Sequence, residues 1–292
     1  MSHKIIFFGT EDFSAVALQG LIDNNFSIAA VVTKPDSRKG RGQKLLPPAV
    51  KLIATQYNIP VWQPSSLHDI TDDIRALQPV SGVLVSYGKL IPESIIELFT
   101  PGIINLHPSL LPTYRGPSPI ESAILNGDPV TGVSIMQLVK AMDAGPIYSQ
   151  KEVPLIGNET RRALYVSLAS LGTSELIRLL PHILDGSLQP VAQDETQATY
   201  CQLLSKEHSL LRPETSSAVE AERQVRAYQD FPKTKIRFGD HELIVTKAHV
   251  TAQPEHALSI RFRDGNFLTV DELVAPSGRT MNAAAYLNGY AA

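Results

Sequence analysis

The sequence is poor in cysteine, in long apolar runs and in net charge. Its 292 residues contain one cysteine, Cys201, which excludes an internal disulfide and any multi-cysteine metal site. So little cysteine makes the reducing cytoplasm the simplest compartment for the protein. No apolar stretch approaches the length needed to cross a membrane, so we expect no membrane partner. The first apolar run, Ile5–Gly9, is too short for a secretory leader and is expected to form a buried strand.

Two further absences narrow the function. The net charge is −3, which argues against a uniformly basic nucleic-acid binder but leaves room for a local basic patch. The loop Gly9–Phe13 stands where a dinucleotide-binding loop would, yet it has one glycine instead of the spaced set that lets a pyrophosphate approach. We therefore expect a plain strand-to-helix turn and no nicotinamide cofactor. The histidines other than His107 show no metal-ligand spacing, so no metal is expected.

What the sequence does contain, through its first two-thirds, is an alternation of short apolar runs with amphipathic segments. The expected strands are Lys4–Phe8, Ser27–Thr33, Gly82–Val85, Ile103–Leu106, Gly132–Gln137 and Ile147–Val153. The expected helices are Ser14–Asn24, Pro48–Tyr57, Pro92–Phe99, Pro117–Asn126 and Arg161–Leu184. Continuous apolar strands between helices are typical of a mostly parallel sheet covered on both faces. We therefore predict an α/β fold with an open, doubly wound sheet that binds its ligand beyond the carboxyl ends of the strands.

The last third of the chain has a different pattern. Residues 187–205 are polar and irregular, which is typical of a linker between domains. Beyond them, the expected helix Ser216–Ala227 precedes short alternating runs separated by turn signals around Gly239 and Gly265. Such a pattern predicts a small, OB-like β-barrel. We therefore divide the chain into a Rossmann-like domain at 1–186, a linker at 187–205 and a smaller C-terminal domain at 206–292.

The most informative motif is Asn105-Leu-His107-Pro-Ser-Leu-Leu-Pro-Thr-Tyr-Arg115-Gly, followed by Met142-Asp143-Ala-Gly145. Asn105 and His107 are two residues apart at the end of an expected strand, so both side chains leave from one face. An amide donor beside an imidazole suits a carbonyl carbon that becomes a tetrahedral oxyanion. If the fold brings in Asp143, its carboxylate can orient the imidazole and favour the charged form. The alternative is that Asn105 and His107 only cap a loop.

This motif resembles the signature of the formyltransferases that use 10-formyltetrahydrofolate. The resemblance is close through about Lys206 and includes Ile5-Ile-Phe-Phe-Gly-Thr, Lys34-Pro-Asp-Ser-Arg-Lys-Gly-Arg-Gly-Gln-Lys-Leu, Val85-Ser-Tyr-Gly-Lys-Leu-Ile-Pro and Leu203-Leu-Ser-Lys-Glu. These segments resemble the tRNA-directed members of the family, which carry a second, barrel-like domain. The resemblance implies transfer of a formyl group from 10-formyltetrahydrofolate to the α-amine of methionine on initiator tRNA. We expect the enzyme to be a monomer.

The resemblance also implies the residues of the site. The catalytic residues would be Asn105, His107 and Asp143. One wall of the folate site would be the loop formed by Gly88, Lys89, Leu90 and Ile91. The other wall would be the turn formed by Ser109, Leu110, Leu111 and Pro112. Two interpretations of residues 114–116 stay open, since they can face the amine substrate or only pack the loop.

The segment Lys34–Leu45 carries five basic residues and one acidic residue, a local charge of +4. Such a run is often only a solvated face, but the tRNA-directed members have a basic insertion here. The resemblance therefore implies contacts with the tRNA acceptor arm from Arg38, Lys39, Arg41 and Lys44. Departures from those members at Tyr228–Pro232, and in the short tail after Arg279, bear on tRNA binding and not on chemistry.

Two other functions stay open. A sugar-nucleotide formyltransferase would share the Asn, His and Asp set, but a basic loop has no obvious use for a small amine acceptor. A folate-binding or RNA-binding module without turnover belongs to another class, and the intact set of three polar residues argues against it.

Overall fold

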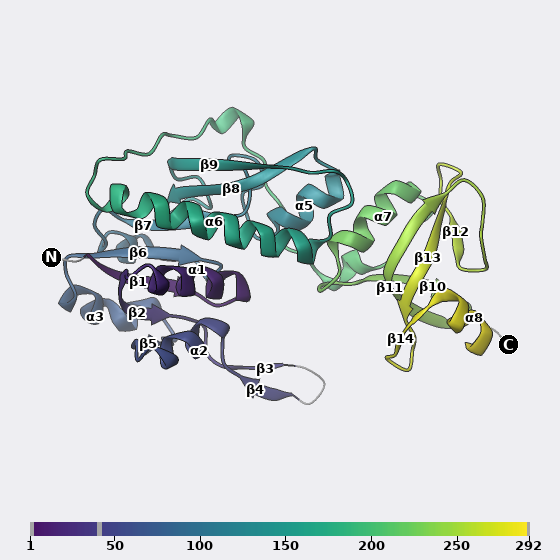
Figure 1. Cartoon of the computed structure of the whole chain (residues 1–292), viewed down its shortest axis with the longest axis horizontal. Helices are drawn as coiled ribbons and strands as arrows, with labels where there is room; N and C mark the ends of the chain where they lie inside the picture. The colour runs from purple at the N-terminus through teal and green to yellow at the C-terminus, as the bar shows by residue number, and fades with distance from the viewer. Residues whose placement is uncertain (1–2, 40–42, 291–292) are drawn as a thin grey trace. The chain divides into compact units, whose positions relative to one another are not determined.

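The computed structural model describes residues 3–39 and 43–290 (Figure 1). Contacts group the chain into two compact units. The first unit comprises Met1–Pro117, Gly132–Val153 and Tyr165–Tyr200, and the second comprises Ser118–Thr131, Pro154–Leu164 and Cys201–Ala292. The predicted division into domains at 1–186 and 206–292, joined by a linker at 187–205, stays a prediction.

A seven-stranded sheet with the order β5-β2-β1-β6-β7-β8-β9 forms the centre of the first unit. Its strands are β1 (Lys4–Gly9), β2 (Ser27–Val32), β5 (Val61–Trp62), β6 (Val80–Val85), β7 (Ile103–His107), β8 (Val130–Gln137) and β9 (Ile147–Pro154). Strand β1 pairs in parallel with β2 and β6, β2 with β5, and β6 with β7, whereas β8 runs antiparallel to β7. The predicted α/β fold with an open, mostly parallel sheet is confirmed.

The central strands are buried on both faces, as is typical of a parallel sheet. Residues 5–8 of β1 are fully buried, so both faces of the strand are covered, as a parallel sheet requires. The covering helices are α1 (Asp12–Asp23), α2 (Ala49–Gln56), α3 (Thr71–Ala76), α4 (Glu93–Ile96) and most of α6 (Arg161–Leu184). The rings of Phe13 in α1 and Tyr165 in α6 meet edge to face, with centroids 5.2 Å apart, so these helices lie side by side (Figure 1).

Helix α6 corrects one expectation from the sequence. With 24 residues, it is long and apolar enough to cross a membrane by length and composition alone. Half of its most apolar 18-residue stretch is buried inside the molecule. A core helix of a soluble protein can be equally long and equally apolar, so length and composition alone are weak evidence for a membrane span. The helix also packs directly on β7, because any side chain at Gly172 would collide with Leu106.

The second unit contains an antiparallel half-barrel sheet with the order β10-β11-β13-β12, to which β14 adds beside β13. Its elements are α5 (Pro119–Asn126), α7 (Ala218–Ala227), β10 (Thr234–Phe238), β11 (His241–Thr251), β12 (Ser259–Arg261), β13 (Phe267–Val274), β14 (Thr280–Asn282) and α8 (Ala283–Tyr290). Helix α7 begins with a capping box in which Ser217 Oγ accepts from Glu220 N at 3.2 Å. Leu243, Leu268 and Tyr286 are fully buried in the core of this unit.

The basic segment, expected as a loop, contains a short hairpin of β3 (Ser37–Lys39) and β4 (Lys44–Leu46). Its base is anchored by charge. Lys51 Nζ donates to Asp36 at 2.8 Å and to Gln63 at 2.8 Å, and Gln63 Nε2 donates to the carbonyl oxygen of Lys34 at 2.7 Å. The hydrogen bond from Lys51 lowers the pKa of Asp36. These contacts therefore hold the backbone in place just before the first strand of the hairpin.

Candidate active site

Asn105 and His107 lie in β7 between two neighbouring strands. Asn105 stands opposite Leu84 of β6 and Met136 of β8. Because the two residues are two positions apart in one strand, their side chains point to the same face of the sheet. Asn105 is 4% exposed and His107 is 5% exposed. Both polar side chains are therefore held in a nearly closed environment.

The Asn105 amide has no hydrogen-bond partner among residues 3–39 and 43–290. Buried polar side chains in proteins are nearly always hydrogen-bonded. The amide atoms of Asn105 are not among the fully shielded atoms that lack a partner in the described residues, so they keep access to solvent. The N–H donors of Asn105 are therefore available to a ligand.

His107 meets Asp143 across the fold. Nε2 of His107 donates to the carbonyl oxygen of Tyr114 at 3.0 Å. Since a carbonyl only accepts, this contact sets a proton on Nε2. Nδ1 lies 3.8 Å from Oδ2 of Asp143, which is too long for a hydrogen bond but within the range of an ion pair. The three residues expected to form the site are thus distributed over β7 and the connection between β8 and β9.

Asp143 is held in an unusual backbone conformation. Its φ is +48°, and Tyr114, which accepts from His107, has a φ of +60°. Non-glycine residues occupy this region rarely and persist where the surrounding structure over-determines them. One such restraint is Gly116 N, which donates to Oδ2 of Asp143 at 2.8 Å. The carboxylate that faces His107 is therefore fixed from a second direction.

The turn at residues 109–112, the expected second folate wall, is fixed by β8 and β9. Ser134 Oγ donates to the carbonyl oxygen of Ser109 at 2.7 Å and accepts from Leu111 N at 3.1 Å. Gln150 Nε2 donates to the carbonyl oxygen of Leu111 at 2.8 Å. Ser109 Oγ also donates to the carbonyl oxygen of Thr113 at 2.6 Å. The backbone of this turn is thus preorganised.

The loop after β6 forms the other expected wall. Gly88, Lys89 and Leu90 are exposed, whereas Ile91 is buried. Since β6 and β7 are parallel neighbours, this loop and the loop after β7 leave the sheet at the same edge. Lys34 Nζ lies against Gly88, where any side chain would collide with it. The start of the basic segment therefore reaches this loop.

Arg115, whose role the sequence left open, packs the loop after β7. It is fully buried. Its guanidinium donates to both carboxylate oxygens of Glu195, at 2.8 and 2.7 Å, and twice to Oε1 of Gln193, at 3.1 and 2.8 Å. The hydrogen bonds with Glu195 raise the pKa of Arg115, and those from Arg115 lower the pKa of Glu195. No sequence pattern marks Glu195 and Gln193 as partners of Arg115, because both lie in a polar, irregular stretch.

The residues expected to bind tRNA are only partly described. Arg38 and Lys44 are exposed on β3 and β4. Lys39 lies in β3 opposite Lys44. Arg41 lies outside the described residues. Two exposed leucines, Leu45 and Leu46, follow the basic residues on β4.

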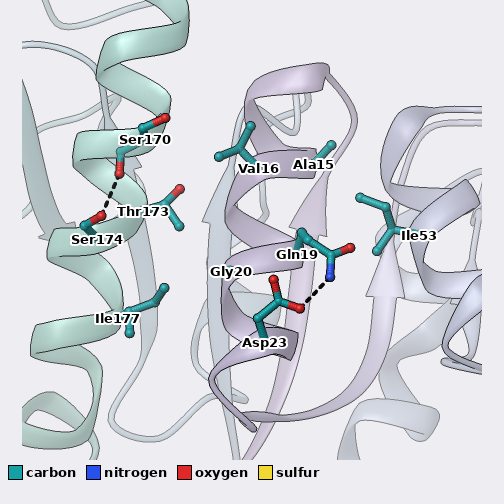
Figure 2. A pocket seen from close by; sticks show the side chains of 10 residues that line it. All are labelled: Ala15, Val16, Gln19, Gly20, Asp23, Ile53, Ser170, Thr173, Ser174 and Ile177. Atoms are coloured by element: carbon teal, nitrogen blue, oxygen red, sulfur yellow. Dashed lines mark hydrogen bonds between the residues drawn. The ribbon is translucent and has the colours of Figure 1, made fainter.

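Among the described residues, the first unit includes a larger and a smaller groove. The larger, of about 620 Å³, lies between α1, α2 and α6 (Figure 2) and is lined by Gln19 and Ser174 among others. None of the expected site residues lines it. The smaller, of about 340 Å³, is lined by Leu111, Pro112 and Gln193. Within residues 3–39 and 43–290, no group of three His, Cys, Asp or Glu side chains could hold a metal ion.

Comparison with known proteins identifies the family. A family model described as formyl transferase matches residues 3–180. A methionyl-tRNA formyltransferase of Sulfurihydrogenibium sp. (strain YO3AOP1) is 37% identical over 272 residues, covering 92% of this chain and 86% of the relative. A methionyl-tRNA formyltransferase of Chloroflexus aggregans (strain MD-66 / DSM 9485) is 36% identical over 300 residues, covering 98% of this chain and 97% of the relative.

A solved structure has the same fold. The sugar 3N-formyl transferase WlaRD, crystallised in the presence of dTDP and 5-N-formyl-THF, matches with a TM-score of 0.69 and 21% identity, covering 92% of this chain and 97% of the other. At this identity the likeness concerns the fold alone. Fold and family model together define a formyl transferase.

The relatives specify the acceptor. Because they match nearly the whole chain at more than 30% identity, the chain belongs to the methionyl-tRNA formyltransferases. It is an enzyme that transfers a formyl group to methionyl-tRNA, a step that supports translation initiation. The resemblance seen in the sequence is therefore confirmed.

Proposed function

We propose that the formyl donor is 10-formyltetrahydrofolate and that the acceptor is the α-amine of methionine on initiator tRNA. The observation that carries the transfer chemistry is the unpartnered amide of Asn105, which is 4% exposed, and the methionyl-tRNA formyltransferase relatives support the acceptor. The amine nitrogen attacks the formyl carbon, a C–N bond forms, and negative charge develops on the formyl oxygen. Asn105 donates a hydrogen bond to that oxygen, and a donor placed in a closed site stabilises such charge strongly. The bond to N10 then breaks.

His107 and Asp143 complete the catalytic set. Nε2 of His107 donates to the carbonyl oxygen of Tyr114, and Nδ1, the remaining ring nitrogen, lies 3.8 Å from Oδ2 of Asp143. The carboxylate stabilises the charged imidazole, which assists the developing oxyanion. Asp143 also holds a water that relays a proton from the attacking amine to the departing N10. Protons and charge balance without a covalent enzyme intermediate.

The folate binds between the two preorganised loops. One wall is Gly88, Lys89, Leu90 and Ile91, and the other is Ser109, Leu110, Leu111 and Pro112. Leu90 is 77% exposed, so it offers apolar surface that a flat ring would cover. The fixed backbone of the turn at 109–112 offers polar groups that need no rearrangement before they bind.

The tRNA is held by the basic hairpin. Arg38, Lys39, Arg41 and Lys44 contact phosphates of the acceptor arm, which positions the charged end without reading its sequence. The anchored base at Asp36 and Lys51 gives the hairpin a fixed origin. Residues 206–292, joined through 187–205, form a second tRNA-binding domain that follows the catalytic domain at 1–186. The protein acts as a cytoplasmic monomer.

The test compares acceptors under one set of conditions. The full chain is incubated with 10-formyltetrahydrofolate and with charged initiator tRNA, charged elongator tRNA or a dTDP-amino sugar. Fast formylation of the initiator alone supports the proposal. Equal rates with both tRNAs would remove the initiator preference, and transfer to the amino sugar without transfer to tRNA would overturn the acceptor. Binding of folate without any transfer would favour a module without turnover.

A further inference from the structure

Gln193 lies outside every motif that the sequence offered, yet its side chain joins two parts of the site. Nε2 of Gln193 donates to the carbonyl oxygens of Asp143, at 2.8 Å, and Gly145, at 2.7 Å. Its Oε1 accepts twice from the guanidinium of Arg115, at 3.1 and 2.8 Å. Both donors and both lone pairs of the amide are therefore used.

These partners fix the orientation of the amide. A flipped Gln193 would set its oxygen against two carbonyl oxygens and its N–H groups against a guanidinium that has no acceptor. Only one orientation satisfies all four contacts, so the assignment follows from the network. Gln193 thus acts as a bridge of defined polarity from Arg115 to the Asp143–Gly145 turn.

The backbone around Gln193 is itself held. Val191 exchanges two hydrogen bonds with Ile147 at the start of β9, at 2.8 and 2.7 Å. On the other side, Asp194 Oδ1 accepts from Thr196 N at 3.0 Å and caps a short 3-10 turn. Thr199 adds a third tie, since its carbonyl oxygen accepts from Arg115 N at 2.9 Å. The backbone on both sides of Gln193 is therefore restrained, so its side chain can hold the Asp143–Gly145 turn in place.

The turn at Asp143 needs such a restraint. Asp143 has a φ of +48°, a conformation that a non-glycine residue intrinsically disfavours, so surrounding contacts have to maintain it. Gly145 leaves no room for a side chain, because one would collide with the carbonyl oxygen of Gln137. Gln193 binds the carbonyl on each side of Ala144, while Gly116 N holds the Asp143 carboxylate. Main chain and side chain of Asp143 are thereby restrained from different directions.

We infer that Gln193 is a positioning residue for Asp143: by holding both carbonyls of the turn, it keeps the carboxylate beside Nδ1 of His107. The inference rests on the role proposed for Asp143. Arg115 positions Gln193 in turn, so the segment expected as a linker is part of the framework of the site. No contact between Gln193 and a substrate is implied.

The first test uses steady-state kinetics with charged initiator tRNA. Gln193→Ala lowers kcat by about 10- to 100-fold, as small displacements of a catalytic group do, and leaves the KM of both substrates near their wild-type values. Gln193→Glu keeps an acceptor for Arg115 but sets carboxylate oxygens against two carbonyls, so it lowers kcat at least as much. The control is Gln197→Ala, an exposed amide of the same segment whose Nε2 donates to Asp194 at 3.0 Å, and its kcat is unchanged.

A double-mutant cycle distinguishes positioning from general damage. In an Asp143→Ala background, adding Gln193→Ala has little further effect on kcat, because groups that act as a unit are not additive. Losses that multiply, or a folded Gln193→Ala with wild-type kcat, overturn the inference. If thermal unfolding shows that Gln193→Ala does not fold, the cycle is run with Gln193→Glu. Absence of formylation by the wild-type chain would instead overturn the proposed function.

Discussion

At the residue scale, Asn105 allows chemistry and folding to be tested separately. The residue is 4% exposed and its amide hydrogen-bonds to no described residue, so removing the amide breaks no internal hydrogen bond. Asn105→Ala should lower kcat by on the order of 100-fold or more, as loss of an oxyanion donor does. The Tm should not show the decrease that loss of an internal hydrogen bond causes. Steady-state rates and thermal unfolding measure both, and Asn105→Asp, which keeps the volume but not the donors, should be as slow. Near-normal turnover of either variant would contradict the oxyanion role.

The same scale shows what a sequence can and cannot reveal about a site. The shared face of Asn105 and His107 was predictable, because the alternation of side chains along a strand is local. The partner of His107 was suggested by a motif, and its distance from Nδ1 depended on the fold. Gln193 was missed, since its bonds to the Asp143 turn join positions 50 residues apart. Nothing in an irregular polar stretch marks one amide as a bridge.

At the element scale, the elements missing from the prediction are short. Shortness alone does not hide an element, because the four-residue helix α4 lies within the predicted helix Pro92–Phe99, where a proline marks the start. Helix α6 has 24 residues and its pattern was clear, whereas α3 has six residues and buries only Ile74. Hydrophobic periodicity needs a window of about 11–18 residues, so α3, β5 and the β3–β4 hairpin fall below what it detects. The sequence predicts a loop where the hairpin lies, because its exposed leucines and charged residues have no alternating buried face.

The hairpin carries a prediction about salt. Each phosphate contact that is removed should flatten the salt dependence of tRNA binding by roughly one unit of slope. Arg38→Ala and Arg41→Ala should each raise the KM for charged tRNA and flatten this slope, while folate binding stays intact. Initial rates against tRNA concentration at several salt levels provide the measurement. Arg75→Ala is the matched control, since Arg75 is an exposed arginine of α3 paired with Asp72 at 3.2 Å. If the KM for charged tRNA and the slope of its salt dependence are unchanged in the hairpin variants, the hairpin does not contact the tRNA and is only a solvent-exposed surface.

The C-terminal sheet carries a prediction about pH. Burial opposes the charged form of His249, but Asp271, at 3.0 Å, and Glu255, at 3.4 Å, raise its pKa above the ordinary value. A raised pKa adds stability that is complete below about pH 6.5 and is lost as the pH rises through the folded-state value. His249→Gln should therefore lower the Tm by at most a few degrees near about pH 6 and leave it unchanged near about pH 9. His241→Gln, an exposed histidine on the same strand, is the control. An equal loss at both pH values would point to packing instead.

At the scale of the whole molecule, charge is distributed locally. The net charge is −3, and residues 206–292 hold eleven basic and eleven acidic residues. A long-range field of the whole protein cannot therefore steer tRNA toward it. We propose that the segment at 34–45, whose local charge is +4, supplies the main attraction. The proposed catalytic residues and the proposed tRNA-binding surface are then separate parts of the chain, and we expect their sensitivities to salt to differ.

This separation predicts how the wild-type enzyme responds to a truncated acceptor. With charged initiator tRNA, four phosphate contacts from Arg38, Lys39, Arg41 and Lys44 should make log(kcat/KM) fall with log salt at a slope of roughly −3 to −4. With the methionyl ester of adenosine, the amine and the formyl donor are the same but the phosphate backbone is gone. The slope should then be near zero, while kcat at saturation changes less than kcat/KM, because Asn105, His107 and Asp143 meet the same reacting atoms. Initial rates for both acceptors over one salt series give the comparison. Equal slopes would mean that salt acts on the catalytic residues or on folate binding, and the hairpin would lose its assigned role.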